Sequence, residues 1–406
     1  MIDLGSRWHD AALLLAGHRD VLDRPLEEPA LSARGWSTFL LSLDDAALAA
    51  LETGGLDAAW PSDTPASLLA LLEQTRGVCA LPGLVRSIGG TSVERTRRHE
   101  RPRKQAQVDA FARLILPLAT TAARVLDIGS GHGHLTREIA ERVAVPVVGL
   151  ERDATLAQRA RGLTGDRVRA PSFTSIDVLR DGVVFASGDC VIGLHACGEL
   201  GDVLVTGVAA SRADTLALVG CCLQKQRAPA RLPLCTLPAS PGLDLNAALA
   251  LPKDLLGLSN LTPRDHGVEA SRVDNLAGRE RRVALHRLLS SLAPTAAPRL
   301  GSEMQGLNRR AAQLELPALV ARACELRSLP PPSTAAIDEA ASWAREQQAR
   351  ARRLQLPRTM LARALEVFVL LDRARFLEER GFMVEVGIAF PASVSARNLA
   401  LLATRR

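Results

Sequence analysis

An apolar run, a glycine-rich turn and a helix-forming stretch follow one another in VLDIGSGHGHLT, residues 125–136. The apolar run is long enough for a buried strand that ends at Asp127. Glycines at 129, 131 and 133 let the backbone turn tightly, approach a ligand closely and present amide groups at a helix start. We therefore expect a strand, loop and helix unit that binds a ligand.

The sequence around this unit alternates between strands and helices. The strand-like runs are RVLDIGS, PVVGLER, CVIGLHA and TLALVGCC, with a weaker one in VRAPSFTSID. Such alternation predicts parallel strands covered by helices on both faces. Two later runs, FMVEVGIAF and ARNLALLAT, are expected to add an antiparallel hairpin. The predicted fold class is α/β, a doubly wound, seven-stranded, mostly parallel sheet.

The domain organisation follows from length, because 406 residues exceed what one compact core usually holds. Residues 1–95 are predicted to form short helices, and their sequence shows no catalytic or ligand-binding motif. Residues 96–406 would form the sheet domain, with an insertion or lid at about 223–357, since that stretch is too long for a loop. A strong helix is expected after the insertion, ended by Gly381.

The glycine spacing separates two classes of cofactor. A dinucleotide-binding loop, G-x-G-x-x-G, would need a third glycine at position 134, where this chain has histidine. The pattern here is G-x-G-x-G, the loop of S-adenosylmethionine-dependent methyltransferases. Glu151 ends the next strand and suits the two ribose hydroxyls of such a ligand. The predicted cofactor is S-adenosyl-L-methionine, bound by Gly129, Ser130, Gly131, Gly133 and Glu151.

Three further residues are predicted to contact the cofactor. Leu194 lies near the end of the strand CVIGLHA. Asp127 would either face the ammonium group of the cofactor or brace the glycine turn. Asp177 would either hold the adenine amino group or act as a helix cap or surface acid.

Two later motifs, GLHACGEL and LVGCC, carry a family resemblance. The chain resembles class I methyltransferases of the branch with GLHxCGDL and CC motifs, found in eukaryotic methyltransferase-like proteins and in the glutathione-transferase C-terminal-domain-containing protein. The acceptor-stem tRNA 2′-O-methyltransferases carry a related pair, KHLCG and CC. The resemblance extends from about Lys104 to ARNLALLA near the C-terminus. It implies a Rossmann-like fold and methyl transfer from S-adenosylmethionine.

The chain departs from this family in several places. The family's KKxHE element is RKQAQ here, with Ala106 and Gln107 where histidine and glutamate would fall. Leu223 and Gln224 follow the CC pair, where the family often has an aromatic residue or histidine. The zinc clusters that flank the tRNA enzymes are absent from the sequence. These departures concern the substrate more than the cofactor.

His195 is the predicted catalytic residue. It ends the fourth strand, at the edge where parallel sheets bind ligands, and would contact the acceptor or remove its proton. The alternative is a histidine that only shapes the pocket floor. No metal is expected at the nearby cysteines, because Cys221 and Cys222 are adjacent and would point to opposite faces of a strand.

Charge and cysteine usage suggest partners and location. The net charge is +6, and arginines cluster at 95–103, 279–282 and 350–358, which favours RNA, such as tRNA or rRNA, as the methyl acceptor. A protein or small-molecule acceptor, or a non-catalytic RNA-binding or scaffold role, stays open. Seven irregularly spaced cysteines favour reduced thiols and a cytoplasmic location. No apolar run is long enough to suggest a membrane partner.

Overall fold

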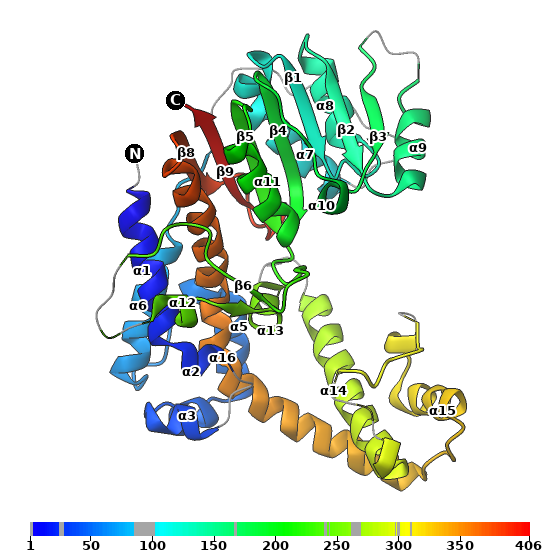
Figure 1. The fold of residues 1–406 in the computed structure, drawn as a ribbon. Helices are drawn as coiled ribbons and strands as arrows, with labels where there is room; N and C mark the ends of the chain where they lie inside the picture. Colours follow the sequence, from blue (N-terminus) through cyan, green and yellow to red (C-terminus); the bar gives the residue numbers. More distant parts are fainter. Residues whose placement is uncertain are drawn as a thin grey trace.

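The computed structural model describes residues 3–23, 28–84, 102–165, 169–238, 242, 244–260, 269–296, 298, 301–308 and 311–406. A seven-stranded sheet lies at the centre of the part shown uppermost in Figure 1, in the order β3-β2-β1-β4-β5-β9-β8. Its strands are β1 (Arg124–Ile128), β2 (Val147–Glu151), β3 (Ser172–Ser175), β4 (Asp189–Cys197), β5 (Thr215–Cys221), β8 (Phe382–Ile388) and β9 (Leu399–Arg405). Strands β1 to β5 are parallel, and β9 runs antiparallel to both β5 and β8. The predicted doubly wound, mostly parallel sheet is therefore confirmed.

Helices cover both faces of the sheet. Alternate residues of each strand point to opposite faces, so Val125 and Ile192 pack with α7 (Pro102–Thr120) and α8 (His134–Arg142). Leu126 and Val191 join the core on the other face, where α11 (Glu199–Ala210) and α16 (Thr334–Glu378) lie. Two shorter helices complete the crossovers, α9 (Ala154–Gly162) and α10 (Val178–Asp181). The continuous apolar runs of the strands follow from this coverage on both faces.

The N-terminal region consists of short helices, as the sequence predicts. They are α1 (Leu4–Gly17), α2 (Arg19–Leu22), α3 (Glu28–Ala33), α4 (Ser37–Ser42), α5 (Asp45–Gly54), η1 (Gly55–Asp57) and α6 (Ala66–Cys79). Asp44 caps α5 by accepting a hydrogen bond from the Ala47 amide. Trp8 of α1 packs against Phe368 of α16, with ring centroids 6.0 Å apart. These helices share one hydrophobic core with α16 and one face of the sheet.

A helical arm, from residue 269 to about residue 350, projects from the rest of the molecule (Figure 1). It is part of the longer segment between β5 and β8. The elements of this segment are β6 (Ala230–Arg231), α12 (Leu245–Ala248), β7 (Leu251–Pro252), α13 (Lys253–Leu256), η2 (Gly257–Asn260), α14 (Glu269–Leu292), η3 (Pro294–Ala296), η4 (Ala311–Gln313) and α15 (Leu316–Arg327), followed by α16. A separate core joins α14, α15 and the first half of α16 through Leu285, Leu319 and Ala340. Helix α16 runs unbroken through Pro357, where the sequence analysis ends the insertion. Leu354, Leu356 and Met360 are buried on both sides of the proline, and this packing offsets its missing hydrogen bond.

A buried ionic network ties the two ends of the segment between β5 and β8, namely β6 and the second half of α16, to the sheet domain. Asp202 of α11 accepts two hydrogen bonds from Arg231 of β6, at 2.9 and 3.0 Å, and one from Arg373 of α16, at 2.8 Å. Asp372 accepts a further hydrogen bond from Arg231 at 2.6 Å. Although burial works to raise the pKa of Asp202, the Arg373 and Arg231 guanidiniums lower it to about 2. The carboxylate is therefore charged at neutral pH.

Within the described ranges, no helix has the combination of length and apolar composition that crossing a lipid bilayer would require.

Candidate cofactor and acceptor site

The predicted site residues meet at one edge of the sheet. Because β1 to β5 are parallel, their carboxyl ends lie together, and the order of the strands sets the order of the residues along the edge. Asp177 follows β3, Glu151 ends β2, the glycine loop follows β1, and His195 lies near the end of β4. Strand β9 runs the opposite way, so in Figure 1 this edge faces down toward the arm.

The glycine loop has the backbone that its composition predicts. Gly129, Gly131 and Gly133 have φ values of 74°, 55° and 72°, a region that other residues rarely adopt. Gly133 is also required by packing, since a Cβ there would lie 2.4 Å from the Phe173 ring. The Gly131 amide donates to Glu151 Oε2 at 2.9 Å. The structure therefore joins the loop and the predicted ribose-binding acid directly.

Two features of the loop fit a bound cofactor. Ser130 Oγ is buried and has no hydrogen-bond partner among the described residues, so a polar ligand atom would satisfy it. The other oxygen of Glu151 accepts from the Asp153 amide at 3.0 Å, which holds the carboxylate in place beside the loop. A site with an unsatisfied hydroxyl and an oriented carboxylate suits a ligand that carries hydroxyl and amine groups.

Asp127 supports the glycine loop through a hydrogen bond with α8. Its carboxylate accepts a hydrogen bond from the Thr136 hydroxyl of α8 at 2.7 Å, and the side chain is buried. Burial raises the pKa of Asp127 to about 6, against the opposing effects of the Thr136 hydrogen bond and the Lys104 charge. Of the two predicted roles, the structure shows the bracing contact. Contact with a cofactor stays a proposal.

The raised pKa of Asp127 predicts a specific pH dependence of stability. An unfolded aspartate has a pKa of about 3.9, so the folded state binds this proton more tightly than the unfolded state does. The contribution of this group to stability therefore falls as pH rises from about 4 to about 6, by on the order of 2–3 kcal/mol. Asp127→Asn should match the parent's melting temperature near pH 4 and exceed it at pH 7.5. A gain in melting temperature of the same size at both pH values would contradict the raised pKa. The exposed Asp63→Asn serves as control.

The other two predicted cofactor contacts have structural roles of their own. Asp177 caps α10 by accepting from the Leu179 amide at 3.1 Å, which is the cap alternative of the sequence analysis. Leu194 is partly buried and packs against the core on the α7 and α8 face. Neither role excludes a ligand on the exposed side of these residues, so both remain predicted contacts.

His195 is held in a defined orientation. Its φ of 68° is unusual for a residue other than glycine and coincides with an irregularity in the pairing of β4 with β5. Its Nε2 lies 2.8 Å from Gln107 Oε1, and Gln107 Nε2 donates to the Val394 carbonyl at 3.2 Å. Because Gln107 Oε1 can only accept, Nε2 carries the proton and the lone pair is on Nδ1. Burial, with the charges of Lys104 and Arg397, lowers the pKa of His195 to about 4, so the ring is neutral at pH 7.

Three cysteines meet beside His195. The sulfur atoms of Cys197, Cys221 and Cys222 all lie within 4.8 Å of one another. The prediction that Cys221 and Cys222 point apart is wrong, because Cys222 leaves the strand with a φ of 43°. The hydrogen bond with Cys221, aided by the charge of Lys225, lowers the pKa of the Cys197 thiol to about 6. The same contact raises the pKa of Cys221.

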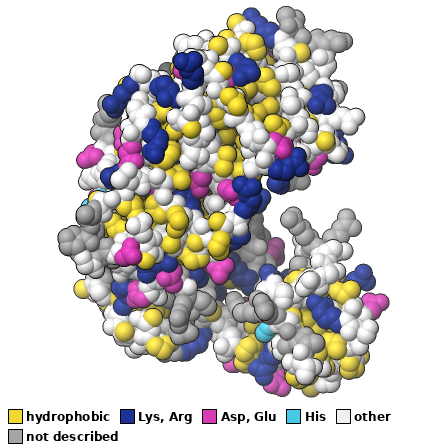
Figure 2. All heavy atoms as spheres, viewed as in Figure 1, with side chains coloured by type: hydrophobic (Ala, Val, Ile, Leu, Met, Phe, Trp, Pro, Cys, Tyr) yellow, Lys and Arg dark blue, Asp and Glu magenta, His cyan; other side chains and the backbone are white. Residues whose placement is uncertain are grey.

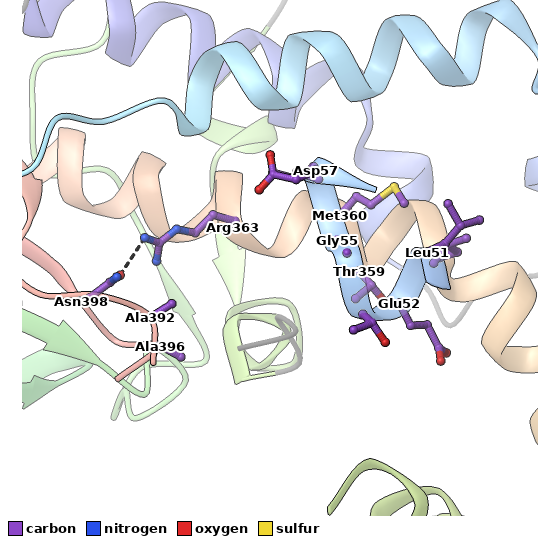
Figure 3. A pocket seen from close by; sticks show the side chains of 14 residues that line it. Leu51, Glu52, Gly55, Asp57, Thr359, Met360, Arg363, Ala392, Ala396 and Asn398 are labelled. Carbon is purple, nitrogen blue, oxygen red and sulfur yellow. Dashed lines mark hydrogen bonds between the residues drawn. The ribbon is translucent and has the colours of Figure 1, made fainter. Parts of the chain in front are cut away.

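A pocket that the sequence analysis missed lies at the junction of three distant segments. It measures about 170 Å³ and is lined by α5 and η1, by α16 and by the loop before β9 (Figure 3). Within it Arg363 donates to Asn398 Oδ1 at 2.8 Å. The same loop supplies Val394, which holds Gln107. No local signal in the sequence marks this pocket, because its residues are ordinary and come together only on folding.

Several arginines that were predicted to contact RNA form ion pairs with carboxylates of the same chain. Arg352 pairs with Glu52 at 2.7 Å, Arg353 with Asp45 at 2.7 Å, and Arg282 with Glu303 at 2.6 Å. Arginines 95 to 101 lie outside the described residues. The described pairs reduce the positive charge that these segments offer to a partner.

The strand order, the glycine loop and the acid beside it define a Rossmann-like fold of the class I methyltransferase type. Residues 103–229 match the family model described as a methyltransferase domain. The matched segment contains β1 to β5, Glu151 and His195.

Three solved structures show low overall similarity to this chain. The magnesium protoporphyrin IX methyltransferase of Synechocystis PCC 6803, with bound SAH, is 20% identical over 32% of this chain and 61% of its own, with a TM-score of 0.25. The plantazolicin methyltransferase BpumL is 10% identical over 76% and 87%, with a TM-score of 0.31. A TehB-like SAM-dependent methyltransferase of Corynebacterium glutamicum is 16% identical over 27% and 61%, with a TM-score of 0.23. The chain thus spans less than two thirds of the first and third of these proteins.

Proposed function

We propose that this protein transfers a methyl group from S-adenosylmethionine to an acceptor, and that the acceptor is RNA. The observation that carries the methyl-transfer proposal is the hydrogen bond from Gly131 to Glu151, which joins a three-glycine loop to an acid at the next strand end. The methyltransferase-domain match over residues 103–229 supports S-adenosylmethionine as the cofactor. The buried, unsatisfied Ser130 hydroxyl is consistent with a ligand at this loop.

In this assignment the protein acts mainly by alignment. S-adenosylmethionine supplies an electrophilic methyl group on a sulfonium, and in-line attack needs a well-placed nucleophile. Glu151 would accept hydrogen bonds from the ribose hydroxyls, and the loop amides would face the methionine part. His195 would contact the acceptor through Nδ1, since Gln107 occupies Nε2.

Calorimetry with S-adenosylmethionine, SAH and NAD⁺ tests the cofactor assignment. We expect saturable binding of the first two compounds at micromolar concentrations and no binding of NAD⁺. A protein that binds neither S-adenosylmethionine nor SAH would refute the proposal. Binding without methyl transfer to any cell fraction would favour the non-catalytic alternative.

Substitutions at His195 and Gln107 test the acceptor side of the site. His195→Asn tolerates the positive φ and removes the imidazole, and we expect kcat to fall by about 100-fold or more while cofactor affinity is retained. Gln107→Ala should lower kcat through misorientation of the ring. Gln107→Glu keeps the acceptor oxygen but loses the donor to the Val394 carbonyl, so it should restore only part of kcat. These values come from steady-state kinetics with a labelled methyl group. Full turnover by His195→Asn would contradict its assignment to the acceptor side.

The shape and charge near the site support the RNA acceptor. Figure 2 shows a hollow between the sheet domain and the arm, with Lys and Arg side chains along its upper rim. The carboxyl edge of the sheet faces this side in the same view (Figure 1). A basic rim above a hollow suits an extended anionic acceptor, and the net charge of +6 acts in the same direction.

Labelled methyl transfer to separated cell fractions distinguishes the acceptors. We expect label in total RNA that is lost after nuclease treatment and retained after protease treatment. Label only in protein, or only in small molecules, would replace the RNA acceptor with that class. Methyl transfer itself would stand in either case.

A further inference from the structure

The cysteine cluster beside His195 has the composition and the spacing of a metal site. Cys197 Sγ and Cys221 Sγ lie 3.0 Å apart, and both sulfurs also lie near the His195 carbonyl oxygen, at 3.5 and 3.0 Å. Cys222 Sγ completes a group in which every pair of sulfurs is within 4.8 Å. Sulfurs that share one tetrahedral zinc ion at the usual bond length of about 2.3 Å lie about 3.8 Å apart. Small side-chain adjustments would therefore bring all three sulfurs to one ion.

The chain brings these residues together by two separate devices. Cys197 and Cys221 are directly paired in the register of β4 and β5. Cys222 would ordinarily point to the opposite face, but its left-handed backbone turns its sulfur to the same side. Such a conformation is costly for a residue with a side chain, and residues of this kind concentrate at functional sites. A two-cysteine redox pair would need only Cys197 and Cys221, so the third sulfur points to a metal ligand set.

The surroundings of the cluster suit a metal–thiolate group. A cavity of about 30 Å³ lies beside Cys221 and Cys222 and is also lined by Arg397, and it has room for one water molecule. Arg397 Nε is buried without a hydrogen-bond partner among the described residues. Three thiolates around a divalent ion carry a net charge of −1, which a nearby guanidinium offsets. Thiolate ligands in tetrahedral arrangement favour zinc among the common divalent metals.

We propose that Cys197, Cys221 and Cys222 bind one Zn²⁺ ion at the carboxyl edge of the sheet, beside the acceptor side of the methyl-transfer site. Binding displaces to solvent the protons that the cysteine thiols still carry, and leaves three thiolates around one Zn²⁺ with a net charge of −1. The ion would fix the ends of β4 and β5, and with them the backbone of His195. This proposal does not depend on methyl-transfer activity, because metal binding is measured directly.

Cobalt substitution tests the proposal on the full-length protein. Protein purified anaerobically, reduced and freed of metal is titrated with Co²⁺. We expect one equivalent to bind, with thiolate-to-cobalt charge-transfer absorption and the strong visible bands of tetrahedral cobalt. Zn²⁺ should displace the cobalt and abolish these bands. Absence of thiolate-to-cobalt bands in the reduced protein would overturn the proposal.

Matched variants locate the site. Cys222→Ser removes one sulfur from a half-buried position and should weaken metal affinity by at least about 100-fold. Mutation of residues that merely support a metal ligand already weakens affinity by up to about 100-fold. Cys79→Ser, in the N-terminal α6, should bind cobalt like the parent protein. Circular dichroism and S-adenosylmethionine binding confirm that each variant is folded. Equal cobalt spectra for Cys222→Ser and the parent, or a Cys197–Cys221 disulfide with no metal bound, would show that the metal assignment is wrong.

Discussion

Asp202→Ala is expected to lower the free energy of unfolding by about 3–5 kcal/mol, because it removes the carboxylate shared by two buried guanidiniums and leaves that of Arg373 without a counter-charge. Arg231 and Arg373 are each 3% exposed in their side chains, so water cannot replace the carboxylate. Arg231 keeps its contact with Asp372, but Arg373 loses its ion-pair partner in the network and retains a hydrogen bond to the Gly198 carbonyl. The network joins α11, β6 and the second half of α16, and we therefore expect the packing of these three elements to be destabilised together.

Denaturant unfolding followed by circular dichroism measures this loss. Asp202→Asn keeps the size of the side chain and removes its charge, so a loss similar to that of Asp202→Ala would assign the effect to charge. The exposed pair of Glu73 and Arg76 provides a control, and Glu73→Ala should change stability by less than about 0.5 kcal/mol. A loss below about 1 kcal/mol for Asp202→Ala would show that the network contributes little net stability.

Glu151→Ala is expected to weaken S-adenosylmethionine binding by about 100-fold, the equivalent of about 3 kcal/mol for hydrogen bonds to a charged group. Glu151 is 9% exposed and already accepts hydrogen bonds from the Gly131 and Asp153 amides. Its removal therefore takes away the ribose-binding carboxylate and frees the loop amide that it holds. Calorimetry at one pH and ionic strength gives the two dissociation constants.

Asp153→Ala is the matched control for this experiment. Asp153 lies two residues from Glu151, but its carboxylate caps α9 by accepting from the Thr155 and Leu156 amides. Its loss should cost about 1 kcal/mol of stability and leave cofactor affinity unchanged. If Glu151→Ala bound S-adenosylmethionine as tightly as the parent, the ribose assignment would be wrong. If both variants lost binding equally, the effect would be structural.

The cofactor side of the site was predictable because its signals are local. Closely spaced glycines after a strand predict a turn with positive φ angles, and the structure shows positive φ at Gly129, Gly131 and Gly133. Glu151 ends the next strand, and a parallel sheet places consecutive strand ends on one edge. The acceptor side was harder to predict from the sequence, because Gln107 is 88 residues from the histidine that it orients.

The cysteines show where reasoning from the strand pattern failed. Alternation of side chains predicts that adjacent cysteines point apart, and it holds only while the backbone is extended. Cys222 lies one residue past the end of β5 and adopts a left-handed conformation. Because β5 ends at Cys221, the backbone of Cys222 is free to turn, and the three cysteine sulfurs meet.

The sequence by itself determined the sheet, its mostly parallel order and the loop with its acid, because these depend on periodicity and on short-range backbone preferences. Only the tertiary structure decided the partner of His195, the meeting of the three cysteine sulfurs, the pocket between α5 and α16, and the internal pairing of arginines such as Arg352 and Arg353. Each of these depends on packing between segments far apart in the chain or on a single φ angle. Such contacts arise from the balance of burial and charge over the whole fold, which no local pattern records.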